Sequence, residues 1–134
     1  MKINKIKILK LPIIKNKLGD ILKFISVKSK YFKEFGEIYF SEIKKNKTKG
    51  WNYHKKYFCF ISVPVGKVKF TICKNFKQKT KKIIIIGKKN YKLLIIPPKY
   101  YFSFRSLEKN SIVANILNKP HNKKETAKIL LKDV

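Results

Sequence analysis

The chain has 134 residues, of which 44% are hydrophobic and 13% aromatic, enough apolar material for the core of a single domain spanning residues 1–134 and too much for a disordered chain. The formal net charge is +27, but Arg105 is the only arginine among 34 basic residues. Specific nucleic-acid binding is not expected, because the guanidinium fork that reads bases and phosphates is almost missing. Compositional drift towards residues with A/T-rich codons explains most of the charge, and weak, salt-dependent association with polyanions remains as a consequence.

The cysteines and the N-terminus indicate the surroundings of the protein. Cys59 and Cys73 lie in apolar, strand-like runs and are interpreted as small core residues, since they fit neither a disulfide framework nor a zinc motif. Lysines interrupt the apolar residues of the N-terminus, so no signal peptide is expected, and no segment is long enough to span a bilayer. We expect a cytoplasmic protein without membrane insertion.

Short strands separated by turns follow one another along the chain. Lysine alternates loosely with isoleucine or leucine in residues 3–11, and Pro12 favours an edge position for this strand. Further strands are predicted at residues 21–27, 36–43, around 50–54, 57–63, 67–73, 83–86, 91–96, 100–107 and 111–117, with turns at 16–20, 44–49, 64–66 and 87–90. The tail, residues 119–134, is charged, and residues 125–131 are predicted to form a short helix. No helical periodicity precedes this tail, so the sequence predicts an all-β, antiparallel sandwich or barrel.

One stretch combines a histidine with polar and aromatic neighbours, Gly50-Trp51-Asn52-Tyr53-His54. Gly50 permits a close approach of the backbone or a φ angle that other residues avoid. Because side chains alternate along a strand, Asn52 and His54 are predicted to share one face, with Trp51 and Tyr53 on the other. If the protein has a functional site, we expect it here.

Four pieces of the sequence are similar, in order, to motifs of one enzyme group. They are residues 36–43 (GEIYFSEI), 49–55 (KGWNYHK), 96–104 (IPPKYYFSF) and 111–115 (SIVAN) followed by 120–122 (PHN). From about Gly19 to about Glu125 the chain resembles the cupin-type sugar-nucleotide isomerases, chiefly the dTDP-4-dehydrorhamnose 3,5-epimerases. It is also similar to the related dTDP-sugar 3,4-ketoisomerases.

The resemblance implies a single cupin jelly roll, that is, a double-stranded β-helix barrel, usually a homodimer that exchanges N-terminal strands. It also implies a nucleoside-diphosphate sugar as ligand and a role in nucleotide-sugar metabolism and surface-polysaccharide biosynthesis. No cofactor is expected. A metal site is not expected either, because His54 has no histidine partner at a nearby alternate position and His121 lies in the tail.

The matching positions depart from the group's functional residues. Asn52 stands where the epimerases have the histidine base, and Asn115 stands where they have a tyrosine acid; an amide can serve neither purpose near neutral pH. Phe102 stands in place of a further histidine. Lys49 replaces the arginine that meets the substrate's phosphates, which keeps the charge but loses the fork. The resemblance thus implies a ligand-binding site whose usual catalytic residues are replaced.

Three more residues are candidates for this site. His54 is the one candidate for proton transfer, and its plainer interpretation is a hydrogen-bonded histidine inside the barrel. Tyr39 is a candidate for stacking on a base or a sugar, and equally for the core. Arg105, as the only arginine, suggests a planar or bidentate contact, with chance retention as the alternative.

Three functions are open on the sequence alone. The first is an enzyme acting beside the ketone of a 4-keto-6-deoxy sugar nucleotide, where one base on one face favours ketoisomerisation over double epimerisation. The second is a non-catalytic cupin module that binds a sugar or a nucleotide, and the replacements at Asn52, Phe102 and Asn115 favour it. The third is a basic protein that binds polyanions through its charge.

Overall fold

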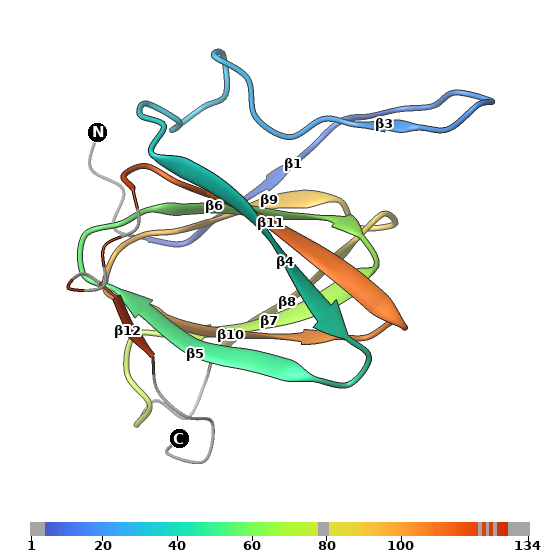
Figure 1. Cartoon of the computed structure of the whole chain (residues 1–134). Helices are drawn as coiled ribbons and strands as arrows, with labels where there is room; N and C mark the ends of the chain where they lie inside the picture. Colours follow the sequence, from blue (N-terminus) through green and yellow to red (C-terminus); the bar gives the residue numbers. More distant parts are fainter. Residues whose placement is uncertain (1–4, 78–80, 121, 123, 125, 129–134) are drawn as a thin grey trace.

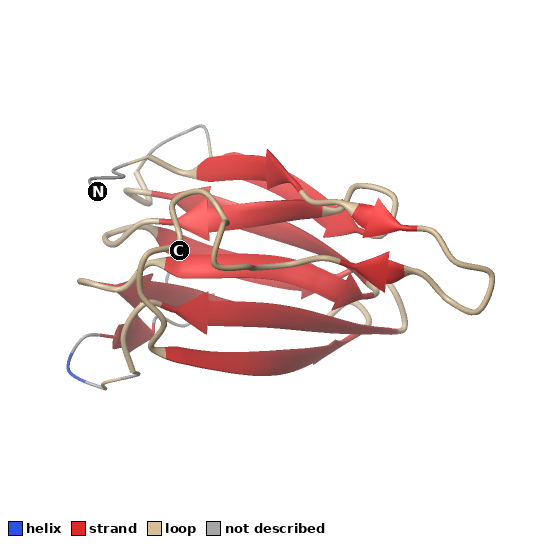
Figure 2. Cartoon of the chain, turned by 90° about the horizontal axis from the view of Figure 1, so that it is seen from above, coloured by secondary structure: helices blue, strands red, loops and turns tan. Residues whose placement is uncertain are grey.

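The computed structural model describes residues 5–77, 81–120, 122, 124 and 126–128, and strands make up nearly all of its regular structure (Figure 2). Two five-stranded antiparallel sheets face each other (Figure 1). The first contains, in spatial order, β1 (Lys7–Lys10), β9 (Lys92–Ile96), β6 (Cys59–Val65), β11 (Asn110–Leu117) and β4 (Glu37–Lys44). The second contains β12 (Thr126–Lys128), β5 (Thr48–His54), β10 (Tyr101–Ser106), β7 (Lys67–Cys73) and β8 (Lys82–Gly87). The predicted all-β, antiparallel architecture is confirmed, and β1 lies at a sheet edge, as Pro12 indicated.

The main core lies between the two sheets, and a second apolar cluster covers the outer face of the first sheet. Along β6, Cys59 and Ile61 point into the main core, whereas Phe60 points outwards into the second cluster. Both faces of this strand are therefore buried, which is why residues 57–63 form a continuous apolar run instead of an alternating one.

The strand predicted at residues 21–27 is wrong for most of its length. Only β3 (Ile21–Leu22) is a strand, paired with β2 (Ile13–Ile14) in a small hairpin that projects beyond the sheets (Figure 1). The next apolar side chains, Phe24 and Ile25, pack on the cluster that covers the first sheet. Burial against a sheet and pairing within a sheet both favour apolar residues, so composition alone did not separate them.

The helix predicted at residues 125–131 is wrong where it is described. Residues 126–128 form β12, whose Thr126 and Lys128 pair with His54 and Asn52 of β5; residues 125 and 129–131 lie outside the described residues. The edge of β5 offers backbone groups that pair with this segment, and this tertiary contact overrides a weak local helical preference. None of the described segments is a helix long and apolar enough to cross a membrane.

Candidate functional site

A cavity of about 290 Å³ lies between the two sheets. Five strands supply its lining, β4, β5, β6, β10 and β11. The lining residues are Tyr39, Ser41, Lys49, Asn52, His54, Ile61, Phe102, Phe104, Val113 and Asn115. Six of the seven site candidates from the sequence thus lie around one space.

The side chains of β5 alternate between this cavity and the opposite face of the sheet. Asn52 and His54 line the cavity. Trp51 is buried on the other face, where its ring meets Phe76 at a centroid distance of 5.3 Å. Tyr53 lies beside Tyr101 there, with ring centroids 4.5 Å apart. The aromatic residues of the motif are therefore packing residues of the outer face.

Gly50 produces an irregularity in β5 that shapes the cavity wall. Its φ is +128°, and a Cβ added to it would lie 2.9 Å from the carbonyl oxygen of Phe102 and from Ser103. The register between β5 and β10 shifts between Phe102 and Phe104. As a result Lys49 and Asn52, which would face opposite ways in a regular strand, both line the cavity.

We expect Gly50→Ala to destabilise the protein more than Gly19→Ala does. Both glycines have a φ near +130°, but the added Cβ meets nothing within 4 Å at Gly19, which makes that variant the matched control for backbone strain. Strain alone costs about 1–3 kcal/mol at such a φ, and the overlap with β10 adds to it at Gly50 only. Urea denaturation of both variants measures the difference, and equal losses would contradict the close approach at Gly50.

His54 is buried on the cavity side of β5, with 6% of its surface exposed. Its ring lies among aromatic rings, 5.4 Å from that of Tyr57 and 6.1 Å from that of Phe102 between centroids. Its backbone carbonyl accepts a hydrogen bond from the Lys99 N–H at 2.8 Å. The main chain and the neighbouring rings therefore fix the position of the imidazole.

Tyr39 and Asn115 face each other across the β4–β11 ladder and are joined by their side chains. The amide Nδ2 of Asn115 donates to the Tyr39 hydroxyl at 3.0 Å. Burial raises the pKa of Tyr39 to about 12, helped by the nearby Cys59 and opposed by this hydrogen bond. The phenol is therefore neutral at physiological pH. Because its oxygen accepts from Asn115, its own hydrogen is available to another acceptor.

The wall behind this pair is buried. Burial raises the pKa of the Cys59 thiol to about 12, so it stays protonated. The Oδ1 atom of Asn115 is buried and has no hydrogen-bond partner among the described residues. At the rim, Lys49 is exposed and its Nζ donates to the Ser41 hydroxyl at 3.0 Å. Lys49 is the one cation among the described residues that line the cavity.

Arg105 does not lie on this cavity. It follows Phe104 on β10 and points to the opposite face, where its guanidinium donates to the Thr48 hydroxyl at 3.3 Å. His121 lies outside the described residues. Within the residues that the structure describes, no group of three His, Cys, Asp or Glu side chains is placed to hold a metal ion.

Four lining residues were not candidates from the sequence, Ser41, Ile61, Phe104 and Val113. A signal for three of them was present, since each lies two positions from a candidate on the same strand: Ser41 from Tyr39, Phe104 from Phe102, and Val113 from Asn115. Ile61 lies on β6, a strand without any candidate residue, so alternation from a candidate could not identify it.

Solved structures that this chain is similar to include dTDP-sugar enzymes. A dTDP-sugar isomerase from Desulfovibrio desulfuricans G20 is 28% identical, with a TM-score of 0.86 over 95% of this chain and 85% of its own. A dTDP-6-deoxy-D-glucose-3,5-epimerase from Legionella pneumophila, in complex with dTDP-4-keto-L-rhamnose, is 19% identical. Its TM-score is 0.81, and the match covers 99% of this chain and 77% of that protein.

A third structure is that of a sugar 3,4-ketoisomerase from Thermoanaerobacterium thermosaccharolyticum, a variant with asparagine in place of a histidine, in complex with TDP-4-keto-6-deoxyglucose. It is 17% identical, with a TM-score of 0.78, and the match covers 94% of this chain and 88% of that protein. No protein-family model and no curated protein matches the sequence. The predicted resemblance is nevertheless confirmed by the structures: the chain has the fold of the cupin-type dTDP-sugar isomerases, 3,5-epimerases and 3,4-ketoisomerases.

Proposed function

We propose that the chain is a nucleoside-diphosphate-sugar isomerase that moves a proton on one face of a 4-keto-6-deoxy sugar. The observation that carries this proposal is that one imidazole and one neutral phenol, those of His54 and Tyr39, line the same cavity. The likeness in fold to proteins crystallised with TDP and with 4-keto sugar nucleotides supports the ligand class. A single cupin jelly-roll barrel is part of the proposal.

The proposed chemistry is a 3,4-ketoisomerisation. His54 takes the proton from C3, and the electrons of that C–H bond form the C3–C4 double bond of an enediolate. The charge develops on O4, to which the Tyr39 hydroxyl donates a hydrogen bond. The imidazolium then returns its proton to C4 while the hydroxyl proton of O3 passes to O4. The product is the 3-keto isomer, and no outside reactant is needed.

The rest of the lining positions the ligand in this proposal. A cavity of about 290 Å³ is near the lower limit of ligand sites, so it takes the sugar ring, and the nucleotide extends outwards. Lys49, exposed at the rim, lies where a diphosphate leaves the cavity and supplies its counter-charge. Asn52, Asn115 and Phe102 contact the sugar. Arg105 points away from the cavity and has no place in the proposed contacts.

The test is incubation with dTDP-4-keto-6-deoxyglucose in heavy water. NMR and mass spectrometry follow deuterium at C3, C4 and C5 and the appearance of a 3-keto product. We expect exchange and isomerisation involving C3 and C4, and none at C5. Exchange at C5 would indicate an epimerase instead, and no exchange despite binding would overturn the catalytic proposal.

A non-catalytic binding module is the second candidate, and Asn52 and Asn115 favour it. Neither amide moves protons near neutral pH, and the ketoisomerase variant with asparagine in place of a histidine was crystallised with its sugar nucleotide. Calorimetric titration with dTDP and with dTDP-sugars tests it. Binding without turnover supports the module, and the absence of binding contradicts both candidates.

The projecting hairpin supports the further proposal of a homodimer that exchanges N-terminal strands. Leu18 at its tip is 99% exposed, and Ile14 and Ile21 on its strands are 46% and 52% exposed. Apolar side chains at these positions gain most from a partner surface. Light scattering should give twice the mass of one chain; the mass of a single chain would contradict the dimer.

A further inference from the structure

A second cavity, of about 620 Å³, shares no lining residue with the first. Turns at the ends of the strands form it, and four of its lining side chains are lysines. The lining residues are Lys15, Pro64, Gly66, Lys67, Ile85, Gly87, Lys88, Lys89, Asn90 and Glu108. Its volume lies within the range of small-molecule sites.

Two glycines bring the lysines of separate turns together. Gly66 follows β6 with a φ of +86°, and Gly87 ends β8 opposite Lys67 in the β7–β8 ladder. A Cβ added to Gly87 would lie 3.0 Å from the carbonyl oxygen of Gly66 and 3.4 Å from the Cα of Lys67. This close approach places Lys67 beside the turn that carries Lys88 and Lys89.

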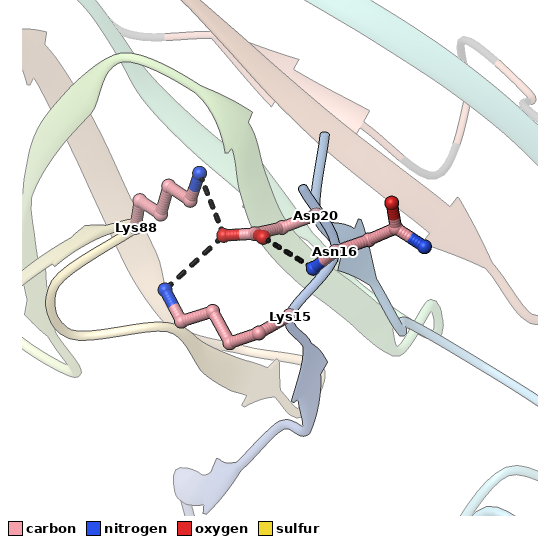
Figure 3. Close-up of polar contacts among 4 residues, drawn as sticks. All are labelled: Lys15, Asn16, Asp20 and Lys88. Atoms are coloured by element: carbon pink, nitrogen blue, oxygen red, sulfur yellow. Dashed lines mark hydrogen bonds and ion pairs between the residues drawn. The ribbon is translucent and has the colours of Figure 1, made fainter. Parts of the chain in front are cut away.

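Asp20 ties the fourth lysine to the same place (Figure 3). One of its carboxylate oxygens, Oδ2, lies 3.1 Å from the Nζ of Lys15 and 3.0 Å from that of Lys88, and the other accepts from the Asn16 N–H at 3.0 Å. These contacts, the backbone hydrogen bond from Asn16 first, hold the pKa of Asp20 well below its usual range. The carboxylate therefore stays ionised and pairs with two of the ammonium groups at the cavity.

The positive charge at this cavity exceeds the negative charge. Four lysines face two carboxylates, those of Glu108 and of Asp20, which leaves two positive charges uncompensated. Within the described part of the chain, no ion pair is formed by Lys67 or Lys89. A multiply charged anion would supply negative partners for Lys67 and Lys89, and the turns already bring these two lysines close together.

We propose that this cavity is a second ligand site, for an oligophosphate, either free or as the phosphate chain of a nucleotide. Several convergent ammonium groups suit a ligand whose negative charges are spaced along a chain, because each phosphate can meet a different lysine. The site is independent of the sugar-nucleotide cavity, since the lysine at the rim of that cavity, Lys49, does not line this one.

The test is a titration of the full chain with inorganic triphosphate at about 0.15 M salt, where weak surface attraction is screened. Amide resonances are followed by NMR, and those of Gly66 and Gly87 report on the cavity. We expect them to shift with a saturable curve, and to do so equally in Lys49→Gln. Absence of shifts at both glycines would overturn the proposal. A parallel titration with ATP shows the source of the phosphates: tighter binding than triphosphate indicates a nucleotide.

Two double variants that lose the same number of charges distinguish binding of triphosphate at this cavity from general attraction of the anion to a basic protein. Lys67→Gln/Lys89→Gln removes two charges from the cavity, and Lys28→Gln/Lys33→Gln removes two exposed charges that line neither cavity. We expect about a tenfold or greater loss of triphosphate affinity in the first pair and less than about a twofold loss in the second. Equal losses in the two pairs would mean that net charge alone attracts the anion.

Discussion

Replacing His54 with asparagine is expected to slow deuterium exchange at C3 of a dTDP-4-keto sugar by about 10²- to 10⁴-fold, the usual contribution of a general base. The side chain lies on the cavity face of β5 and is 6% exposed. Asparagine has a similar shape near the backbone but does not accept a proton near neutral pH. The bound complex should persist, because Lys49 and the apolar lining remain. Exchange measured by NMR at saturating substrate isolates the chemical step from binding.

Asn52→Ala is the matched control for this experiment. Asn52 lies on the same strand and lines the same cavity, two positions before His54. Its loss is expected to weaken binding of the sugar nucleotide and to leave exchange in the saturated complex within about tenfold of the unaltered protein. If exchange persisted in His54→Asn but was lost in Asn52→Ala, His54 would not be the base. If neither changed it, the protons would move by another route.

The sequence predicted which side chains of one strand share a face of the site, but not which side chains of different strands contact each other there. Period-two alternation placed Asn52 and His54 on one face, because that relation depends only on neighbouring residues of one strand. The hydrogen bond between Asn115 and Tyr39 depends on the register between β4 and β11, whose residues are 76 positions apart. No local pattern contains that register.

Arg105 shows a different limit. A lone arginine in a lysine-rich chain suggested a specific contact, but its strand position decides which way it points. It follows Phe104, which lines the cavity, so it faces the other side of β10 and meets Thr48. The residue type suggested a contact in the site, but the alternation of side chains along β10 points Arg105 away from the cavity. The same alternation would have added Ser41 and Val113 to the candidates.

The lysines of this chain fall into two groups, those scattered over the surface and those that converge on one carboxylate. Most lysines among the described residues are exposed and spread along the sequence, as compositional drift predicts. Lys15 and Lys88 differ because one partly exposed carboxylate, that of Asp20, pairs with both of them; its side chain is 12% exposed. Their convergence depends on turns from separate parts of the chain, so a count of charges along the sequence does not contain it.

Truncating Phe70 to alanine is expected to lower the free energy of unfolding by about 3–5 kcal/mol. The side chain is 0% exposed in the main core between the sheets, and removing its ring leaves a cavity that a rigid sheet fills poorly. The loss is a large part of the roughly 5–15 kcal/mol that stabilises a typical domain. Urea denaturation measures it, and Phe35→Ala is the control, since Phe35 is 58% exposed and should lose no more than about 0.5 kcal/mol.

This substitution also tests how the core supports the site. The Phe70 ring lies 5.8 Å from that of Phe104, centroid to centroid, and Phe104 lines the cavity between the two sheets. Without Phe70 the Phe104 ring is free to move into the vacated space, so we expect weaker binding of dTDP-sugars even in conditions where the variant is fully folded. A variant that lost stability but kept its affinity would show that the cavity wall does not depend on this part of the core. A stability loss no larger than that of Phe35→Ala would contradict the close packing between the sheets.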